Sequence, residues 1–266
     1  MSGGWVTVAG LGPGDAALVT PEVTAALAQA TDVVGYIPYV ARVAPRPGLT
    51  LHATDNRVEL DRARHALDLA AAGARVVIVS SGDPGVFAMA SALFEALEAH
   101  PARQGADIRI LPGITAMLAA AARAGAPLGH DFCAINLSDN LKPFAEVERR
   151  VRHAARGGFA MAFYNPRSRA RPHQFGQVLS LLRAECEPER LVLFARAVST
   201  PEGAGPIPRA GCRHDRATPS PRRPWPRPRA AAARAGRSGS PAGRAFGRRS
   251  AWPRRRCRRR SWRPHG

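Results

Sequence analysis

Trp5-Val6-Thr7-Val8-Ala9-Gly10-Leu11-Gly12-Pro13-Gly14-Asp15 is an apolar run that ends in a glycine-rich loop. Val76-Val77-Ile78-Val79-Ser80-Ser81-Gly82-Asp83-Pro84-Gly85 repeats the arrangement. Short apolar runs rich in β-branched residues predict buried strands. Loops at the carboxyl ends of parallel strands are where α/β proteins bind ligands, and glycine allows close backbone approach. Two such loops in one chain predict an α/β protein with one shared ligand site.

Strands and helices are expected to alternate along the chain. Thr20-Pro21-Glu22 supplies an N-cap, a first-turn proline and an early acid, so a helix is predicted over 20–30. The further predicted elements are a strand over 33–36, a helix over 59–72, a strand over 75–80, a helix over 86–99, a strand over 107–111 and a helix from 113 to about 125. This alternation predicts a parallel sheet with helices on both faces.

A second group of elements is expected after Pro127-Leu128-Gly129, which has the composition of a hinge. It consists of a strand over 132–137, a helix over 145–156, a strand over 159–164, a helix over 173–184 and a strand over 191–195. We therefore expect an amino-terminal α/β lobe over 1–125 and a carboxy-terminal lobe over 126–208. The second lobe is expected to be incomplete, because a further strand or two would normally complete its sheet.

The positive charge of the chain is confined to its last 58 residues. The whole chain has 39 basic and 20 acidic residues, a net charge of +19. Residues 209–266 hold 19 arginines and one acid, Asp215, for a net charge of +18. Residues 1–208 hold 39 − 19 = 20 basic and 20 − 1 = 19 acidic residues, a net charge of +1. The nearly neutral body therefore does not indicate a nucleic-acid-binding protein.

The basic tail over 209–266 has eight prolines and neither a helix nor a strand period, and its like charges repel, so it is not expected to fold alone. Three interpretations remain open. It is an arm that binds RNA or DNA, a solvated low-complexity tail, or an out-of-frame translation of a GC-rich gene. The abrupt change of composition and the absence of lysine favour the third. In that case the chain is a truncated product with little activity.

Other sequence signals limit the class of protein to which the chain can belong. Residues 1–14 lack the pattern of a signal peptide, and no apolar run approaches the 18 residues of a membrane span. The four cysteines have no metal-ligand spacing. We expect a cytoplasmic protein with no metal site.

Each candidate site segment also has a purely structural interpretation. The loop over 10–15 departs from the dinucleotide fingerprint at Pro13 and Asp15, so a turn and a ligand loop are equally open. Asp83 either caps the next helix or belongs to a ligand loop. The pair His130-Asp131 is either structural or an acid–base pair, and Ser138-Asp139-Asn140 is either a turn or part of a site.

Four segments occurring in order resemble the tetrapyrrole methylases that use S-adenosylmethionine: Gly10-Leu11-Gly12-Pro13-Gly14-Asp15, Val34-Gly35-Tyr36, Ser81-Gly82-Asp83-Pro84-Gly85-Val86-Phe87 and Pro112-Gly113-Ile114-Thr115-Ala116. Three further segments resemble the branch that methylates carbon 17 of precorrin-3B. They are Gly125-Ala126-Pro127-Leu128-Gly129-His130-Asp131-Phe132-Cys133, Leu137-Ser138-Asp139 and Tyr164-Asn165-Pro166-Arg167-Ser168. The resemblance covers residues 4–202.

The resemblance implies a two-lobed fold, with a parallel sheet in the first lobe, a mixed sheet in the second and the methyl donor between them. The donor contacts it implies are Pro13, Ser81, Gly82, Asp83, Val86, Thr115, Ala116, Asn165 and Ala197. The loop that contains Gly12 and Gly14 would face the tetrapyrrole, and Arg167 and Arg169 would hold its carboxylates. A homodimer is also implied for a chain whose second lobe is complete.

The implied reaction is C17 methylation of precorrin-3B with ring contraction to precorrin-4, a step of cobalamin biosynthesis. Contraction needs proton transfers, so a general acid or base is expected, and the candidates are Asp15, His130 and Ser138. The open alternatives are another ring position, a cobalt-loaded intermediate, a ribosomal-RNA ribose, or a nucleic-acid-binding protein that uses the tail.

Overall fold

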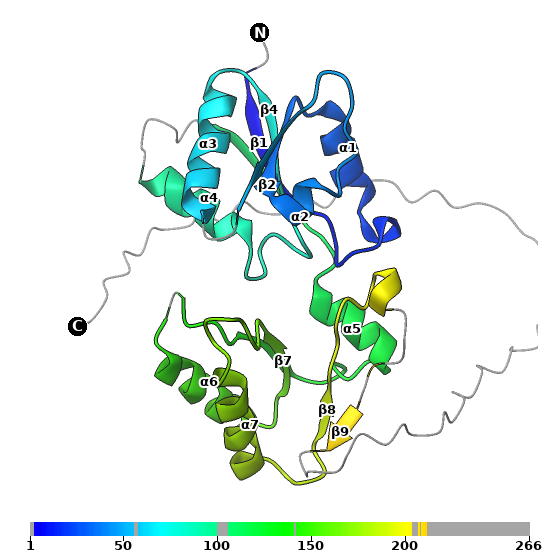
Figure 1. Ribbon diagram of the computed structural model, residues 1–266, viewed down its shortest axis with the longest axis vertical. Coiled ribbons are helices and arrows are strands. Elements are labelled where there is room, and N and C mark those ends of the chain that lie inside the picture. Colours follow the sequence, from blue (N-terminus) through cyan, green and yellow to red (C-terminus); the bar gives the residue numbers. More distant parts are fainter. Residues whose placement is uncertain are drawn as a thin grey trace, which may run out of the picture. The chain divides into compact units, whose positions relative to one another are not determined.

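The computed structural model describes residues 3–55, 58–99, 106–140, 142–203, 207 and 209–211, all within one compact unit, Met1–Ser220 (Figure 1). The three interpretations of the basic tail concern residues that lie, apart from 209–211, outside the described part. They stay predictions.

The first group of elements is built on a five-stranded sheet with every pair parallel, in the order β3-β2-β4-β1-β5. The strands are β1 (Trp5–Gly10), β2 (Asp32–Tyr36), β3 (Thr50–Thr54), β4 (Arg75–Ser80) and β5 (Asp107–Leu111). The helices are α1 (Pro21–Gln29), α2 (Ile37–Val40), α3 (Glu59–Ala71), α4 (Met89–Glu98) and α5 (Ala116–Ala124), with a 3₁₀ turn, η1 (Ala16–Leu18).

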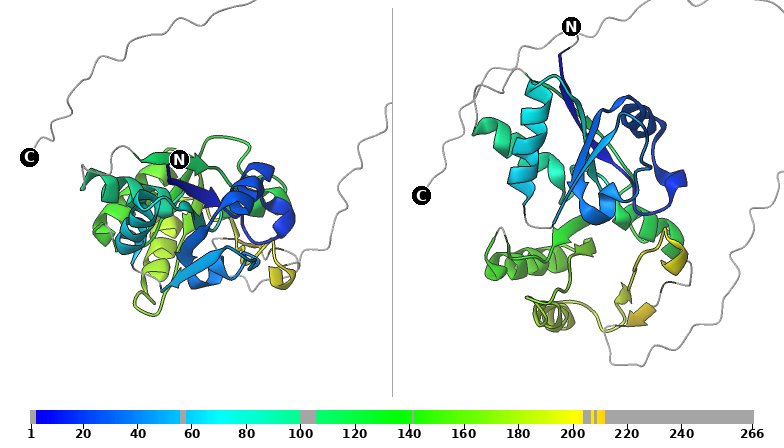
Figure 2. Two further views of the ribbon diagram at one scale, coloured as in Figure 1. Left: turned by 90° about the horizontal axis from the view of Figure 1, so that it is seen from above. Right: turned by 45° about the horizontal axis from the view of Figure 1, so that its top comes forward.

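Apolar side chains cover both faces of this sheet, because successive residues of a strand point to opposite sides. On β4, Val76 and Ile78 pack with buried residues of α3 and α4, whereas Val77 and Val79 pack with those of α1 and α2. Figure 2 shows α3 and α4 on one side of the sheet and α1 on the other. The prediction of a parallel sheet with helices on both faces is confirmed.

The second group contains a parallel pair and an antiparallel pair of strands. β6 (Phe132–Asn136) and β7 (Ala160–Tyr164) are parallel, and β8 (Leu191–Leu193) pairs antiparallel with β9 (Arg209–Gly211). α6 (Phe144–Arg156) and α7 (Gln174–Glu185) share a buried apolar cluster with Ile135 and Leu137. The resemblance implies a mixed sheet in this lobe; its described strands form one parallel and one antiparallel two-stranded sheet.

Three local predictions are wrong in detail. The helix expected from residue 86 begins at Met89, because Phe87 has a φ of 54°, which no α-helix accommodates. The edge strand β3 and the short helix α2 are not predicted. The region from 209 is expected to hold no strand, yet Arg209–Gly211 forms β9.

Candidate functional site

Three loops that follow β1, β4 and β5 touch one another through their backbones. Gly12 and Gly82 exchange two hydrogen bonds: the Gly12 N–H donates to Gly82 O at 3.2 Å, and the Gly82 N–H donates to Gly12 O at 2.9 Å. A Cβ on Gly113 would lie 2.2 Å from Gly82 O, and one on Gly10 would lie 2.6 Å from that oxygen. Glycine at 10 and 113 therefore lets the loops approach each other. The three loops form one rigid cluster at the carboxyl ends of the strands.

Asp83 joins the second and third of these loops. Its Oδ1 accepts from the Gly85 N–H at 2.8 Å, and its Oδ2 accepts from the Gly113 N–H at 3.0 Å. The alternative that Asp83 caps the next helix is wrong, since α4 begins at Met89 and Ala88 is its N-cap. Both carboxylate oxygens are used to fix the loops.

Tyr164, at the end of β7, contacts two of the candidate donor segments. Its phenol oxygen lies 2.5 Å from Thr115 Oγ1 and accepts from the Met117 N–H at 3.0 Å. Its ring packs edge-on against Phe87, with centroids 5.2 Å apart. Thr115 is buried and is the N-cap of α5, but its own hydroxyl makes no capping bond. The phenol from β7 caps the helix in its place.

Strained backbone occurs in or next to several segments that carry expected site residues. Outside glycine, a positive φ occurs among the described residues at Phe87 (54°), Ala126 (58°), Asn165 (51°) and Ala197 (49°). Residues that carry a Cβ rarely adopt a positive φ. Such a backbone conformation persists where the surrounding structure enforces it, often at ligand sites. Asn165 and Ala197 are both sequence-predicted donor contacts, and Phe87 follows a third, Val86.

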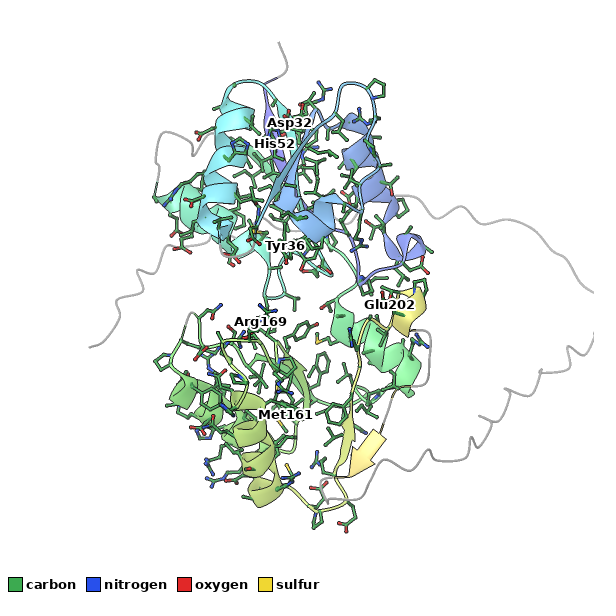
Figure 3. All side chains as sticks on the ribbon, in the orientation of Figure 1. Asp32, Tyr36, His52, Met161, Arg169 and Glu202 are labelled. Carbon is green, nitrogen blue, oxygen red and sulfur yellow. The ribbon has the colours of Figure 1, made fainter. Side chains whose placement is uncertain are left out.

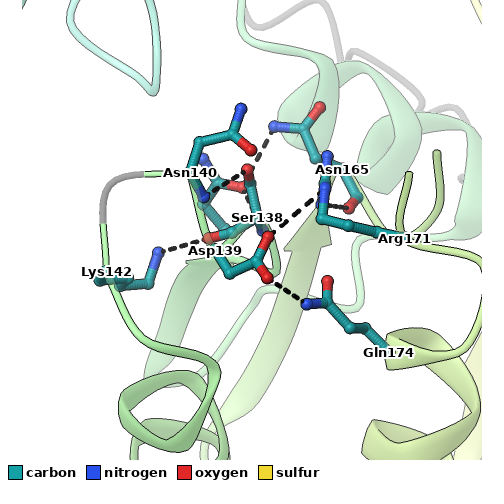
Figure 4. A network of polar contacts seen from close by, with 8 residues as sticks. Ser138, Asp139, Asn140, Lys142, Asn165, Arg171 and Gln174 are labelled. Atoms are coloured by element: carbon teal, nitrogen blue, oxygen red, sulfur yellow. Dashed lines mark hydrogen bonds and ion pairs between the residues drawn. The ribbon is translucent and has the colours of Figure 1, made fainter. Parts of the chain in front are cut away.

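A second polar network surrounds Ser138 (Figure 4). Asn136 Oδ1 accepts from the Ser138 N–H at 2.9 Å and from Asn165 Nδ2 at 3.1 Å. Asp139 accepts from Gln174 Nε2 at 2.6 Å and lies 3.6 Å from Arg171 Nε. This network ties the ends of β6 and β7 together.

Lys142 adds a titratable amine to this network. Its Nζ donates to Ser138 O at 3.2 Å. Burial, and then repulsion from Arg150, lower the pKa of the amine. Lys142 is thus a basic group close to one of the expected acid–base residues.

The three expected acid–base residues do not form one cluster by hydrogen bonding. Asp15 is exposed and accepts from the Ala17 N–H at 2.9 Å, which caps η1. His130 is exposed and has no hydrogen-bond partner in the described part of the chain. Ser138 is buried, and its Oγ accepts from the Asn140 N–H at 3.3 Å. No bond joins any two of the three within the described residues.

The expected donor and substrate contacts differ in how exposed they are. Gly12, Gly82 and Thr115 are buried; Pro13, Gly14, Ser81, Asp83, Val86 and Ala197 are half-buried; Ala116, Asn165, Arg167 and Arg169 are exposed. Arg167 and Arg169 lie on the loop after β7, where Figure 3 labels Arg169, and neither has an ion-pair partner among the described residues. Both guanidinium groups are free to meet an anionic ligand.

A third segment meets the first loop. A Cβ on Gly14 would lie 2.7 Å from Thr200 Cγ2, and the Thr200 N–H donates to Ala197 O at 2.9 Å. Arg123 Nη1 donates to Gly203 O at 2.7 Å and also to Val198 O. The segment that contains Ala197 is thus held between α5 and the Gly14 loop.

Sequence reasoning missed four polar side chains here: Arg42, Lys142, Arg171 and the phenol of Tyr164. Arg42, Arg171 and Tyr164 act through contacts to residues far away in the sequence, whereas Lys142 contacts Ser138 O, four residues away. No local motif predicts these contacts. Arg42 donates to the carbonyls of Leu11, Gly12 and Gly14, at least 28 residues away. The one sequence signal for these four residues was that they lie close to motif residues in the chain.

The described residues hold no group of three or more His, Cys, Asp or Glu side chains that suits a metal ion. Asp32, His52 and His65 form a hydrogen-bonded chain, with 2.8 Å and 3.2 Å between successive atoms. Figure 3 shows Asp32 and His52 at the opposite end of the sheet from Tyr36. No helix of the described part is long and apolar enough to cross a membrane.

Comparison with known proteins gives concordant matches. Residues 6–204 match the family Tetrapyrrole (Corrin/Porphyrin) Methylases. A Sinorhizobium sp. protein named Precorrin-3B C(17)-methyltransferase is 53% identical over 200 residues, 75% of this chain and 79% of that protein.

Solved structures extend these matches. The crystal structure of the methyltransferase CobJ aligns with a TM-score of 0.78 and 77% identity, over 80% of this chain and 88% of that one. The fold alone is shared with the uroporphyrin-III C-methyl transferase of Thermus thermophilus complexed with S-adenyl homocysteine, at a TM-score of 0.56 and 23% identity, over 78% of this chain and 82% of that one.

Proposed function

The chain belongs to the tetrapyrrole (corrin/porphyrin) methylase family, and from this premise we propose that it methylates carbon 17 of precorrin-3B with S-adenosylmethionine. The ring contracts to precorrin-4 in the same reaction, a step of cobalamin biosynthesis. The observation that carries the proposal is the 53% identity to the Sinorhizobium sp. protein of that name, over the residues that build the three interlocked loops.

The donor site is proposed at the carboxyl ends of β1, β4 and β5. Its contacts are Pro13, Ser81, Gly82, Asp83, Val86, Thr115, Ala116, Asn165 and Ala197. Two observations support this placement: ligands of parallel sheets bind at this edge, and the strained residues Phe87, Asn165 and Ala197 lie next to or among these contacts.

The methyl group of the donor's sulfonium is electrophilic by itself, so the protein has to align carbon 17 with it and exclude water. The rigid loop cluster suits this task because it offers fixed backbone groups instead of mobile side chains. The Thr115 hydroxyl is held in place by its hydrogen bond with the Tyr164 phenol. The loop with Gly12 and Gly14 is proposed to face the tetrapyrrole.

Proton transfer for the contraction is assigned to Asp15, His130 or Ser138. His130 is the most available, since its imidazole is exposed and unbonded within the described residues. Arg167 and Arg169 are proposed to hold carboxylates of the substrate by charge-assisted hydrogen bonds.

The lobe division at 1–125 and 126–208, a homodimer and a cytoplasmic location are parts of the same proposal. So is a reaction that uses no resident metal ion. The two buried clusters of the first sheet and the separate cluster around β6 and β7 support the lobe division, since each group of elements has its own core.

The test incubates the purified full chain with S-adenosylmethionine and, separately, precorrin-3B, cobalt-factor III and uroporphyrinogen III. We expect precorrin-4 from precorrin-3B, detected by its mass and absorbance.

Asp83→Asn should slow the reaction, because it disturbs the hydrogen bonds that join two of the loops. Asp61→Asn is the matched control, since the Asp61 carboxylate is 73% exposed and its one ion-pair partner among the described residues is Arg64. Exclusive methylation of another tetrapyrrole would show that the branch is wrong, and no transfer to any of them would refute the proposal for this chain.

A further inference from the structure

Arg42 follows α2 and reaches back to the first glycine loop. Its Nη1 donates to Gly12 O at 3.1 Å, and its Nη2 donates to Gly14 O at 3.2 Å and to Leu11 O. One planar guanidinium thus gathers three carbonyl oxygens of a single turn, which its rigid fork of donors suits well. The turn cannot open without breaking these bonds.

The guanidinium has no carboxylate partner among the residues that the structure describes. It is half-buried, and burial lowers its pKa, while the nearby Tyr39 raises it. Arginine stays charged under these conditions. A half-buried charge is costly unless it is hydrogen-bonded, and here only carbonyl dipoles compensate it. The guanidinium therefore keeps its positive charge beside the loop.

The clasp also sets the direction of the amide groups. In a trans peptide the C=O and N–H point opposite ways, and no cis peptide occurs in the described residues. Because Leu11 O faces Arg42, the Gly12 N–H faces away and meets Gly82 O at 3.2 Å. Because Gly14 O faces Arg42, the Asp15 N–H also faces away, and no described residue accepts from it. The outer side of the loop presents a donor backed by a positive charge.

We propose that Arg42 is a positioning residue for the tetrapyrrole: it fixes the loop over 10–15 in the shape that receives the substrate, and its positive charge, which no described carboxylate neutralises, favours the substrate's carboxylates. This inference rests on the proposed function, which places that loop against the tetrapyrrole. It assigns a role in substrate affinity to a side chain that lies behind the loop.

The chain offers a matched control in Arg46. Its Nη2 also donates to three carbonyls, those of Leu27, Ala28 and Ala30 at the end of α1, at 3.1, 3.0 and 2.6 Å. If Arg42 is only a structural clasp, then Arg42→Met and Arg46→Met should have the same kinds of effect. If Arg42 positions the substrate, only its loss should change tetrapyrrole binding.

The experiment compares the full-length wild type with Arg42→Met, Arg42→Lys and Arg46→Met. The readouts are kcat, KM for precorrin-3B, the Kd of S-adenosylmethionine and of uroporphyrin III, and amide exchange over residues 10–18. For Arg42→Met we expect KM for precorrin-3B and the Kd of uroporphyrin III to rise at least about tenfold, because one charged hydrogen-bonding group is lost. The Kd of S-adenosylmethionine should change by less than about threefold. Exchange of the loop amides should accelerate.

Arg42→Lys keeps the charge without the fork, so its uroporphyrin Kd should lie between those of the wild type and Arg42→Met. It also serves if Arg42→Met does not fold. Unchanged tetrapyrrole affinity in the Arg42 variants, or an equal loss in Arg46→Met, would overturn the inference. A wild type that binds uroporphyrin III but transfers no methyl group would refute the proposed function and leave this comparison valid, whereas a wild type that binds no tetrapyrrole refutes the inference as well.

Discussion

The hydroxyl of Thr115 and the phenol of Tyr164 lie 2.5 Å apart, although 49 residues separate them in the chain. Thr115 begins α5, and Tyr164 ends β7. The same phenol oxygen accepts from the Met117 N–H, so one oxygen both caps a helix and orients a side chain. The two hydroxyls share one hydrogen bond, in which either oxygen can donate. This pair connects the first group of elements to the second.

Tyr164→Phe tests the importance of this connection. The change leaves a buried Thr115 hydroxyl and the Met117 N–H without their partner, which should cost about 1–3 kcal/mol of unfolding free energy. Donor affinity should fall by about tenfold, since Thr115 loses its fixed orientation. Urea unfolding and calorimetry with S-adenosylmethionine measure the two effects.

Tyr36→Phe is the control for this change, because the Tyr36 hydroxyl has no hydrogen bond within the described residues. It removes a phenol oxygen without removing a cap. Equal losses of donor affinity in the two variants would contradict a specific role for Tyr164.

Local signals were sufficient for much of the first group of elements. Thr20 accepts from the Val23 N–H and Pro21 opens α1, as the capping pattern predicts. The runs of β1 and β4 are buried on both faces of the sheet, so composition alone reveals them. The edge strand Thr50–Thr54 is short, polar and half-exposed, and it has no such signature.

The candidate site was predictable only in part, for a physical reason. The loop glycines are visible in the sequence, but the atoms that they meet are not: Gly113 is needed because Gly82 O lies against it. The roles of Arg42 and Tyr164 arise from contacts across 28 or more residues, which neither periodicity nor spacing encodes. The start of α4 was misplaced because the left-handed Phe87 is set by its tertiary surroundings.

Gly82→Ala separates backbone strain from ligand binding. Gly82 has a φ of 64°, and a Cβ would find its nearest atom at 3.5 Å, so strain and not crowding opposes the change. We expect a cost of about 1–2 kcal/mol in unfolding free energy. We also expect at least about fivefold weaker binding of S-adenosylmethionine, because the loop shifts to relieve the strain.

Gly48→Ala is the matched control, because Gly48 has a φ of 77° and no atom within 4 Å. It should lose similar stability with unchanged donor affinity. Calorimetric titration with S-adenosylmethionine measures the donor affinity of both variants. Full donor affinity in Gly82→Ala would show that this loop is not part of the donor site.

The contacts of Glu146 predict that the stability of helix α6 depends on pH. Hydrogen bonds from Arg149, and then from Arg150, lower the pKa of this carboxylate from 4.5 to about 2. Because the folded pKa lies below the unfolded one, the stabilising contribution is present above about pH 4.5 and is lost as the pH falls through about 2. A carbon-13 titration of the Glu146 carboxyl group should report the low pKa in the wild type.

Arg149→Gln should move that titration back toward the ordinary range, because the largest cause of the shift is removed. High salt should do so partially, since the pair is exposed and screened. An ordinary pKa in the wild type at low salt would show that these contacts do not persist in solution.

Gly113→Ala should disrupt the loop cluster itself. A Cβ there would lie 2.2 Å from Gly82 O and 2.8 Å from Gly10 O, both backbone atoms that cannot rotate away. The loops have to separate, which also stretches the bond from the Gly113 N–H to Asp83, so we expect a loss of at least about 3 kcal/mol in unfolding free energy. Gly129→Ala provides the comparison, because its nearest atom would be Ala126 O at an ordinary 3.5 Å. Urea unfolding followed by circular dichroism measures both. If Gly113→Ala is as stable as Gly129→Ala, the three loops are not packed as tightly as described, and the rigid platform proposed for the methyl donor does not exist.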